Sequence, residues 1–170
     1  SEEYNNYYAT EIFTDNYQSV GVAAASQSKT HEKRKRLYTW DEKMYTKSGY
    51  GYDKNVWEGP YKGILGCNLV LDNLDEMSGG KRARESLRGE ALVLRSWYYL
   101  QLVNLFGIAY NQGDPRIDLG VPLKLKSSIT AQHHKRKTIE EVYTQIENDL
   151  LEGNQLLTEY DFDRNFYRIG

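Results

Sequence analysis

The hydrophobic pattern is clearest between residues 82 and 107, where apolar positions recur at intervals of three and four. This spacing places them along one face of an α-helix. One row consists of Ala83, Leu87, Ala91, Leu94, Tyr98, Leu102 and Leu105, and a second row beside it consists of Leu92, Tyr99, Val103 and Phe106. The second half of this helix is apolar around most of its circumference, so we expect other helices to cover it from two sides.

Charged residues and a glycine complete the prediction for this helix. Arg88, Glu90 and Arg95 must lie at the margins of the apolar rows or find partners, because an unpaired buried charge is costly. The helix is predicted to end at Gly107, since glycine accepts the left-handed backbone of a common C-terminal cap.

A preceding helix is predicted over residues 54–77, with Asp53 as its N-cap. Its buried side is expected to comprise Trp57, Tyr61, Ile64, Cys67, Asn68, Leu71 and Leu74. Asn68 requires hydrogen-bond partners there, and we expect it to close a loop. Gly79 and Gly80 interrupt the pattern, so this helix and the next are predicted to form an antiparallel hairpin.

A third helix is predicted over residues 139–157. Thr138 and Glu141 have the spacing of a capping box, which marks the start of a helix. Its apolar positions are Ile139, Val142, Tyr143, Ile146, Leu150 and Leu157. The three helices are expected to lie side by side, with the helix of residues 82–107 in the middle.

The remaining segments are predicted to be connections within one domain of residues 1–170. A short amphipathic helix is expected near residues 2–14, followed by a long loop at about 15–52 and another at about 107–137. Within the second loop, residues 121–125 alternate leucines around a proline, which indicates an edge strand or a strap across the helices. The predicted fold class is all-α, built of stacked helical hairpins.

Composition changes this picture in one respect, the use of tyrosine. The chain of 170 residues carries 15 Tyr and only 4 Phe, while its net charge of −2 gives no overall field that would attract nucleic acid. Tyrosine is over-used on surfaces that bind ligands, including sugars, and it also fills half-wet helix interfaces. Both interpretations stay open. The single cysteine, Cys67, excludes a disulfide within the chain and is expected to be a small core residue.

Three aromatic residues are the candidate ligand-binding residues: Trp40, Tyr50 and Tyr52. Tyr50 and Tyr52 alternate with Gly49 and Gly51, and these glycines disfavour a helix. We therefore expect the two tyrosine rings to be displayed from a loop. The alternative is that Trp40 and one tyrosine only cover the end of the core between the packed helices.

Motifs for catalysis, metals and cofactors are absent from the sequence. There is no Gly-x-Ser-x-Gly, His-Glu-x-x-His, Cys-x-x-Cys or dinucleotide glycine pattern. The basic clusters at 31–36 and 133–137 lack the interleaved aromatic residues of a nucleic-acid site, and adjacent histidines at 133–134 lack a third zinc ligand. We therefore expect no enzyme activity, no cofactor, no metal site and no nucleic-acid partner.

An ordered set of motifs runs through the predicted helices and the strap. Its members are Trp57, Tyr61, Ile64 and Asn68; Arg88-Gly89-Glu90-Ala91, Leu94-Arg95, Tyr98-Tyr99, Leu102-Val103 and Phe106-Gly107; Gly120-Val121-Pro122-Leu123; and Thr138, Glu141-Val142-Tyr143, Ile146 and Asp149-Leu150. Over about residues 37–157 this set resembles the N-terminal part of the SusD/RagB family of Bacteroidetes surface lipoproteins.

The resemblance implies a tetratricopeptide-like helical scaffold that binds and delivers a nutrient, usually a glycan, without transforming it. It further implies a TonB-dependent, SusC-like transporter as partner and a place on the extracellular face of the outer membrane. Family members attach there through a lipidated cysteine that this chain lacks, and they run several hundred residues further, so we expect an incomplete member. The competing hypothesis is a helical-repeat module that binds proteins and no small molecule.

Overall fold

The computed structural model describes residues 35–36, 38–41, 55–128 and 134–158. The chain divides into two compact units, residues 1–59 and 60–170, and the boundary falls within a helix. In the first unit, Thr39 donates its N–H to the carbonyl of Lys35 at 2.9 Å, which closes a single helical turn. The predicted helix at 2–14 and the N-cap Asp53 lie outside the described residues.

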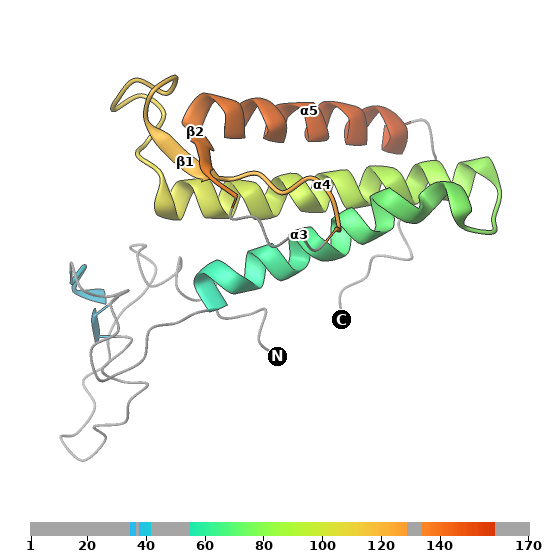
Figure 1. Cartoon of the computed structure of the whole chain (residues 1–170), viewed down its shortest axis with the longest axis horizontal. Helices are drawn as coiled ribbons and strands as arrows, with labels where there is room; N and C mark the ends of the chain where they lie inside the picture. The colour runs from blue at the N-terminus through green and yellow to red at the C-terminus, as the bar shows by residue number, and fades with distance from the viewer. Residues whose placement is uncertain (1–34, 37, 42–54, 129–133, 159–170) are drawn as a thin grey trace, which may run out of the picture. The chain divides into compact units, whose positions relative to one another are not determined.

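The described elements are α3 (Asn55–Asn73), the 3₁₀ helix η1 (Leu74–Glu76), α4 (Lys81–Phe106), β1 (Leu119–Pro122), β2 (Arg136–Thr138) and α5 (Ile139–Thr158). Within the second unit, α4 lies between α5 and the part of α3 that follows Gly59 (Figure 1). The fold is mostly helical, as predicted, with α4 as the middle helix.

The α3–α4 hairpin turns through η1 and a short loop. Gly79 adopts a φ of 150°, which a residue with a side chain rarely adopts, and Gly80 is the N-cap of α4. Farther along, a Cβ at Gly63 would overlap the ring of Tyr98, so α3 and α4 approach each other closely there. The glycines predicted to break the pattern do form the turn.

Of the two predicted helix ends, the start of α5 is confirmed and the cap of α4 is wrong. Glu141 accepts the Thr138 N–H at 2.8 Å and returns its own N–H to the Thr138 hydroxyl at 3.2 Å, which confirms the capping box of α5. Gly107 ends α4, but its φ of −103° and ψ of 165° are extended, so the predicted left-handed cap is wrong. The chain instead leaves α4 in an extended conformation, and the Gly107 N–H still donates to the Val103 carbonyl at 2.8 Å.

The buried face of α4 is the second of the two predicted rows rather than the first. Leu94 is 50% exposed and Ala83 and Leu87 are also exposed, so their assignment to the core is wrong, while Ala91 and Leu102 of the first row are buried. The buried residues are Gly89, Ala91, Leu92, Arg95, Ser96, Tyr99, Leu102 and Val103. The predicted face was wrong because α5 packs against the side of α4 that carries Gly89 and Arg95. A search for apolar residues alone does not recognise a glycine or a paired charge as part of a core.

Small residues let α4 and α5 come close together. A Cβ at Gly153 would lie 3.1 Å from the carbonyl oxygen of Gly89, and one at Gly89 would lie 3.2 Å from that of Gly153. The buried face of α5 consists of Ile139, Val142, Ile146, Asp149 and Gly153. Leu150 is exposed, so its predicted place in the core is wrong, and Asp149 lies there instead.

The segment between α4 and α5 is both an edge strand and a strap. β1 pairs with β2 in antiparallel fashion, with Leu119 opposite Thr138 and Pro122 opposite Arg136. The Arg136 guanidinium donates to the carbonyls of Phe106 at 2.6 Å and Gly120 at 2.5 Å, which ties β1 to the end of α4. Residues 123–128 then cross the helices as a strap, as the sequence predicted.

Candidate functional site

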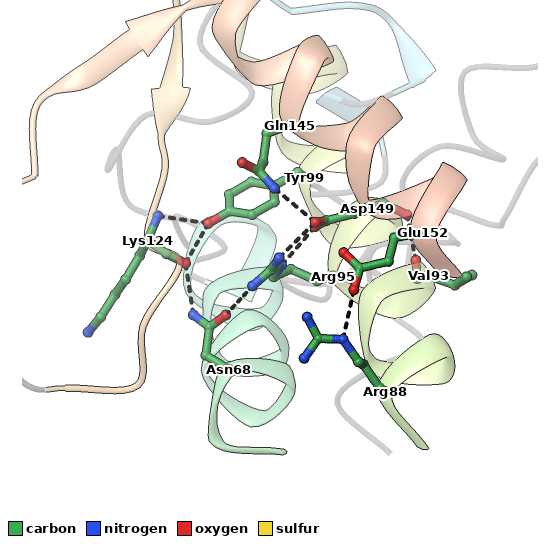
Figure 2. Close-up of polar contacts among 10 residues, drawn as sticks. Asn68, Arg88, Val93, Arg95, Tyr99, Lys124, Gln145, Asp149 and Glu152 are labelled. Carbon is green, nitrogen blue, oxygen red and sulfur yellow. Dashed lines mark hydrogen bonds and ion pairs between the residues drawn. The ribbon is translucent and has the colours of Figure 1, made fainter. Parts of the chain in front are cut away.

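A buried polar network joins the three helices at Arg95, near the middle of α4. Its guanidinium donates from Nε and Nη2 to the two carboxylate oxygens of Asp149 on α5, each at 2.7 Å (Figure 2). Nη1 donates to the side-chain oxygen of Asn68 on α3 at 2.9 Å. The Gln145 amide adds a third bond to Asp149 at 2.8 Å. One guanidinium therefore fixes the positions of both neighbouring helices.

The Arg95–Asp149 ion pair is buried, unlike the Arg88–Glu152 pair on the surface. The side chains of Arg95 and Asp149 are only 8% and 4% exposed. Burial alone would lower the pKa of the Arg95 guanidinium, but the hydrogen bonds and negative charge of Asp149 outweigh it and raise the pKa. Arg95 therefore keeps its positive charge at physiological pH.

The same network holds the strap against the helices. Asn68 donates its amide to the Lys124 carbonyl at 2.8 Å. The Tyr99 hydroxyl donates to that carbonyl and accepts the Lys124 N–H, both at 2.8 Å (Figure 2). Tyr61 donates to the Pro122 carbonyl at 2.8 Å. Asn68 therefore closes a loop, as expected, and it also receives a bond from Arg95.

The chemistry of these groups suits support rather than reaction. Burial raises the pKa of Tyr99 to about 12 and raises that of Tyr61 as well, so both hydroxyls stay neutral near pH 7. Burial likewise raises the pKa of the Cys67 thiol, which leaves it a poor nucleophile. Across residues 55–128 and 134–158 and the short described turn before them, no three His, Cys, Asp or Glu side chains are grouped to hold a metal ion.

Of the three predicted ligand residues, only Trp40 lies in the described part of the chain. Its side chain is 65% exposed, and its φ of 52° is left-handed, a conformation that is uncommon outside glycine. Tyr50 and Tyr52 lie outside the described residues. The described residues do not test whether these three residues lie together, so their shared role stays a prediction.

The residue that sequence reasoning missed is Asp149. A signal for it exists, because Ile139, Val142, Ile146, Asp149 and Gly153 follow the three-four spacing of one helix face. Leu150, four residues after Ile146, fits the same spacing, so the apolar residue was chosen over its acidic neighbour. An acidic residue in such a row indicates a buried partner of opposite charge.

Comparison with known protein families decides the family. A SusD-like family model described as "Starch-binding associating with outer membrane" matches residues 1–168. The chain belongs to this SusD-like family. The tetratricopeptide-like helical fold expected from the resemblance is the fold of its SusD-like neighbours.

Solved SusD-like structures agree with the assignment. A putative sugar binding protein from Bacteroides vulgatus is 31% identical with a TM-score of 0.62, over 71% of this chain and 26% of that protein. A SusD-like carbohydrate binding protein from the same organism is 33% identical with a TM-score of 0.58, over 64% and 23%. A laminarin binding SusD-like protein is 26% identical with a TM-score of 0.55, over 67% and 23%. A comparison with curated proteins found no match.

The SusD-like chain spans about a quarter of the length of these structures. Among the helices that the structure describes, none is long and apolar enough to cross a membrane.

Proposed function

We propose that this chain is the N-terminal helical portion of a non-catalytic carbohydrate-binding and uptake component of the outer membrane. The observation that carries the proposal is the match of the SusD-like family model over residues 1–168. The 31% and 33% identities to sugar-binding and carbohydrate-binding proteins support it. In this proposal the protein works with a TonB-dependent transporter and is anchored on the extracellular face.

The geometry of the described residues supports a scaffold role. Arg95 and Asp149 use their charges on each other, and Asn68 and Tyr99 use their polar atoms on Arg95 and the strap. Groups committed in this way are not available to transfer protons to a substrate. The helices would therefore hold a binding surface in place rather than perform chemistry.

We propose that Trp40, Tyr50 and Tyr52 contact the glycan. The flat apolar faces of aromatic rings stack on the C–H face of a pyranose ring, while amides and charged groups bond to its hydroxyls. The high exposure of Trp40 supports this role, since a tryptophan in the core of a domain would be covered.

Titration of glycans into the full-length protein tests the proposal, with starch and laminarin oligosaccharides as the first probes. We expect Trp40→Ala to weaken the affinity about tenfold, the size of effect typical of a central aromatic contact. Trp97→Ala is the matched control, because this tryptophan is 53% exposed on the rigid helix α4. The control should bind as the unsubstituted protein does.

Two outcomes would reject parts of this proposal. If the unsubstituted protein binds no carbohydrate on a glycan array but retains a protein partner, it is a helical-repeat interaction module instead. If it binds glycans and the variants Trp40→Ala, Tyr50→Ala and Tyr52→Ala all keep full affinity, the function stands and the nominated residues are wrong.

A further inference from the structure

The strap of residues 123–128 is a surface connection that is bonded into the core between the helices. Its residues form neither helix nor strand, and each is half-buried or exposed. A segment of this kind normally opens by itself, because few buried contacts oppose its release. The Lys124 peptide group departs from that expectation, since its carbonyl accepts bonds from Asn68 and Tyr99 and its N–H donates to the Tyr99 hydroxyl, each at 2.8 Å.

A series of hydrogen bonds links α5 to this peptide group (Figure 2). The Asp149 carboxylate accepts two bonds of 2.7 Å from the Arg95 guanidinium. Arg95 donates in turn to the side-chain oxygen of Asn68 at 2.9 Å, and the Asn68 amide donates to the Lys124 carbonyl. We name these four groups, which come from α5, α4, α3 and the strap, the relay.

The relay has a fixed direction. Carboxylates and backbone carbonyls only accept hydrogen bonds, and a guanidinium only donates them. The Asn68 side chain has one end of each kind, so a flipped amide would set N–H groups against Arg95 and an oxygen against the Lys124 carbonyl. Arg95 therefore fixes the orientation in which Asn68 holds the strap, and Asp149 fixes Arg95.

Burial makes the members of the relay depend on one another. Asn68 is fully buried, and Arg95 and Asp149 are buried as well. Water cannot readily replace a missing partner at such positions, so each bond is strengthened by its neighbours and the loss of one affects the next.

We infer that the relay couples the strap to α5, so that the Lys124 peptide group is released only when α5 separates from α4. Asp149 is then a positioning residue for the strap, acting through Arg95 and Asn68. The strap belongs to the same cooperative unit as the helices, although it lies at the surface and has no regular secondary structure.

Hydrogen exchange of the full-length protein in increasing urea, resolved to single residues, tests the coupling. The Lys124 N–H should exchange with the same opening equilibrium constant and the same urea dependence as an N–H in the middle of α5, such as that of Ile146. Faster exchange at Lys124 that does not respond to urea would reveal a local opening and overturn the inference.

The substitution Asn68→Asp should free the strap and leave the helices together. The new carboxylate would still accept from Arg95, but its second oxygen would lie against the Lys124 carbonyl. Protection of the Lys124 N–H should fall at least about tenfold, while that of Ile146 should change by less than about twofold.

Asn73→Asp is the matched control, because it makes the same change at the exposed end of α3, and it should alter neither N–H. Unchanged protection at Lys124 in Asn68→Asp overturns the inference. An equal loss at Lys124 and Ile146 overturns it as well, since Asn68 would then support only the helices.

The substitution Asp149→Asn tests the relay from α5. Its amide nitrogen would face the donors of Arg95, so protection should fall by a similar factor at Ile146 and at Lys124. Glu152→Gln is the control, because it makes the same kind of change in the exposed Arg88–Glu152 pair between the same two helices, and it should leave both N–H groups protected. A loss confined to Ile146 overturns the inference. If Asp149→Asn does not fold, the result for Asn68→Asp decides.

Discussion

Removing the carboxylate of Asp149 is the sharpest test of how the helices are held together. In Asp149→Ala, the Arg95 guanidinium loses two hydrogen bonds of 2.7 Å and its counter-charge, and keeps only the bond to Asn68. Because the Arg95 side chain is 8% exposed, water cannot readily replace the missing partner. We expect a loss of about 3–5 kcal/mol in the free energy of unfolding, as for other broken buried ion pairs.

Two further variants separate the cost of an orphaned charge from the value of the pair. Arg95→Met with Asp149→Leu removes both charges and should lose far less than Asp149→Ala, because apolar side chains of similar size can replace a buried pair at little cost. Arg88→Ala breaks the Arg88–Glu152 pair, whose side chains are 45% and 47% exposed, and should cost at most about 1 kcal/mol.

Urea unfolding followed by circular dichroism at pH 7 measures all three variants. The reasoning would be refuted if Asp149→Ala cost no more than Arg88→Ala, since the buried network would then contribute no more than a surface pair. It would also be refuted if the double variant were as unstable as Asp149→Ala.

Three further predictions concern packing and pH. Gly153→Ala places a Cβ 3.1 Å from a carbonyl oxygen of α4 and should lower the free energy of unfolding by about 1–3 kcal/mol. Gly66→Ala is the control, because a Cβ there would have nothing within 4 Å, and it should stabilise the protein slightly. Equal effects of the two substitutions on the melting temperature would contradict the close approach of α4 and α5. The Ser127 N–H and the Lys126 ammonium lower the pKa of Asp72 to about 2, so its stabilising effect is present above pH 4 and lost as pH falls toward 2. The difference in unfolding free energy between wild type and Asp72→Asn should therefore shrink over that window, and an equal difference at pH 6 and pH 2 would refute it. Burial raises the pKa of Tyr99 to about 12, so its contribution is full below pH 10 and lost as pH rises to 12; unfolding at pH 9 to 11.5 should show a shallower decline for Tyr99→Phe.

Local features of the sequence predicted the helices and their boundaries well. The capping box at Thr138 and Glu141 depends on residues three apart, and the turn at Gly79 depends on the glycine itself, so neither needs knowledge of the rest of the chain. The family motifs then supplied the class of fold. Such signals are read within one element, which is why they succeeded.

The rotation of the helices was harder to predict, because it depends on contacts between elements. Leu94 and Leu150 fit the apolar rows yet are exposed, while Arg95 and Asp149 are buried because they neutralise each other from positions 54 residues apart. Neither charge looks like a core residue in its own helix. The predicted grouping of Trp40 with two tyrosines stays a prediction, since only Trp40 lies in the described part of the chain.

The helices hold the strap through hydrogen bonds to its main chain, and this has a consequence for which substitutions the strap tolerates. Tyr61, Asn68 and Tyr99 bond to the peptide groups of Pro122 and Lys124, not to their side chains. The exposed side chain at position 125 can therefore change while the path of the strap stays the same, whereas Lys126 bonds to Asp72 through its side chain. Proline at 124 is excluded, because it would delete the amide hydrogen that the Tyr99 hydroxyl accepts.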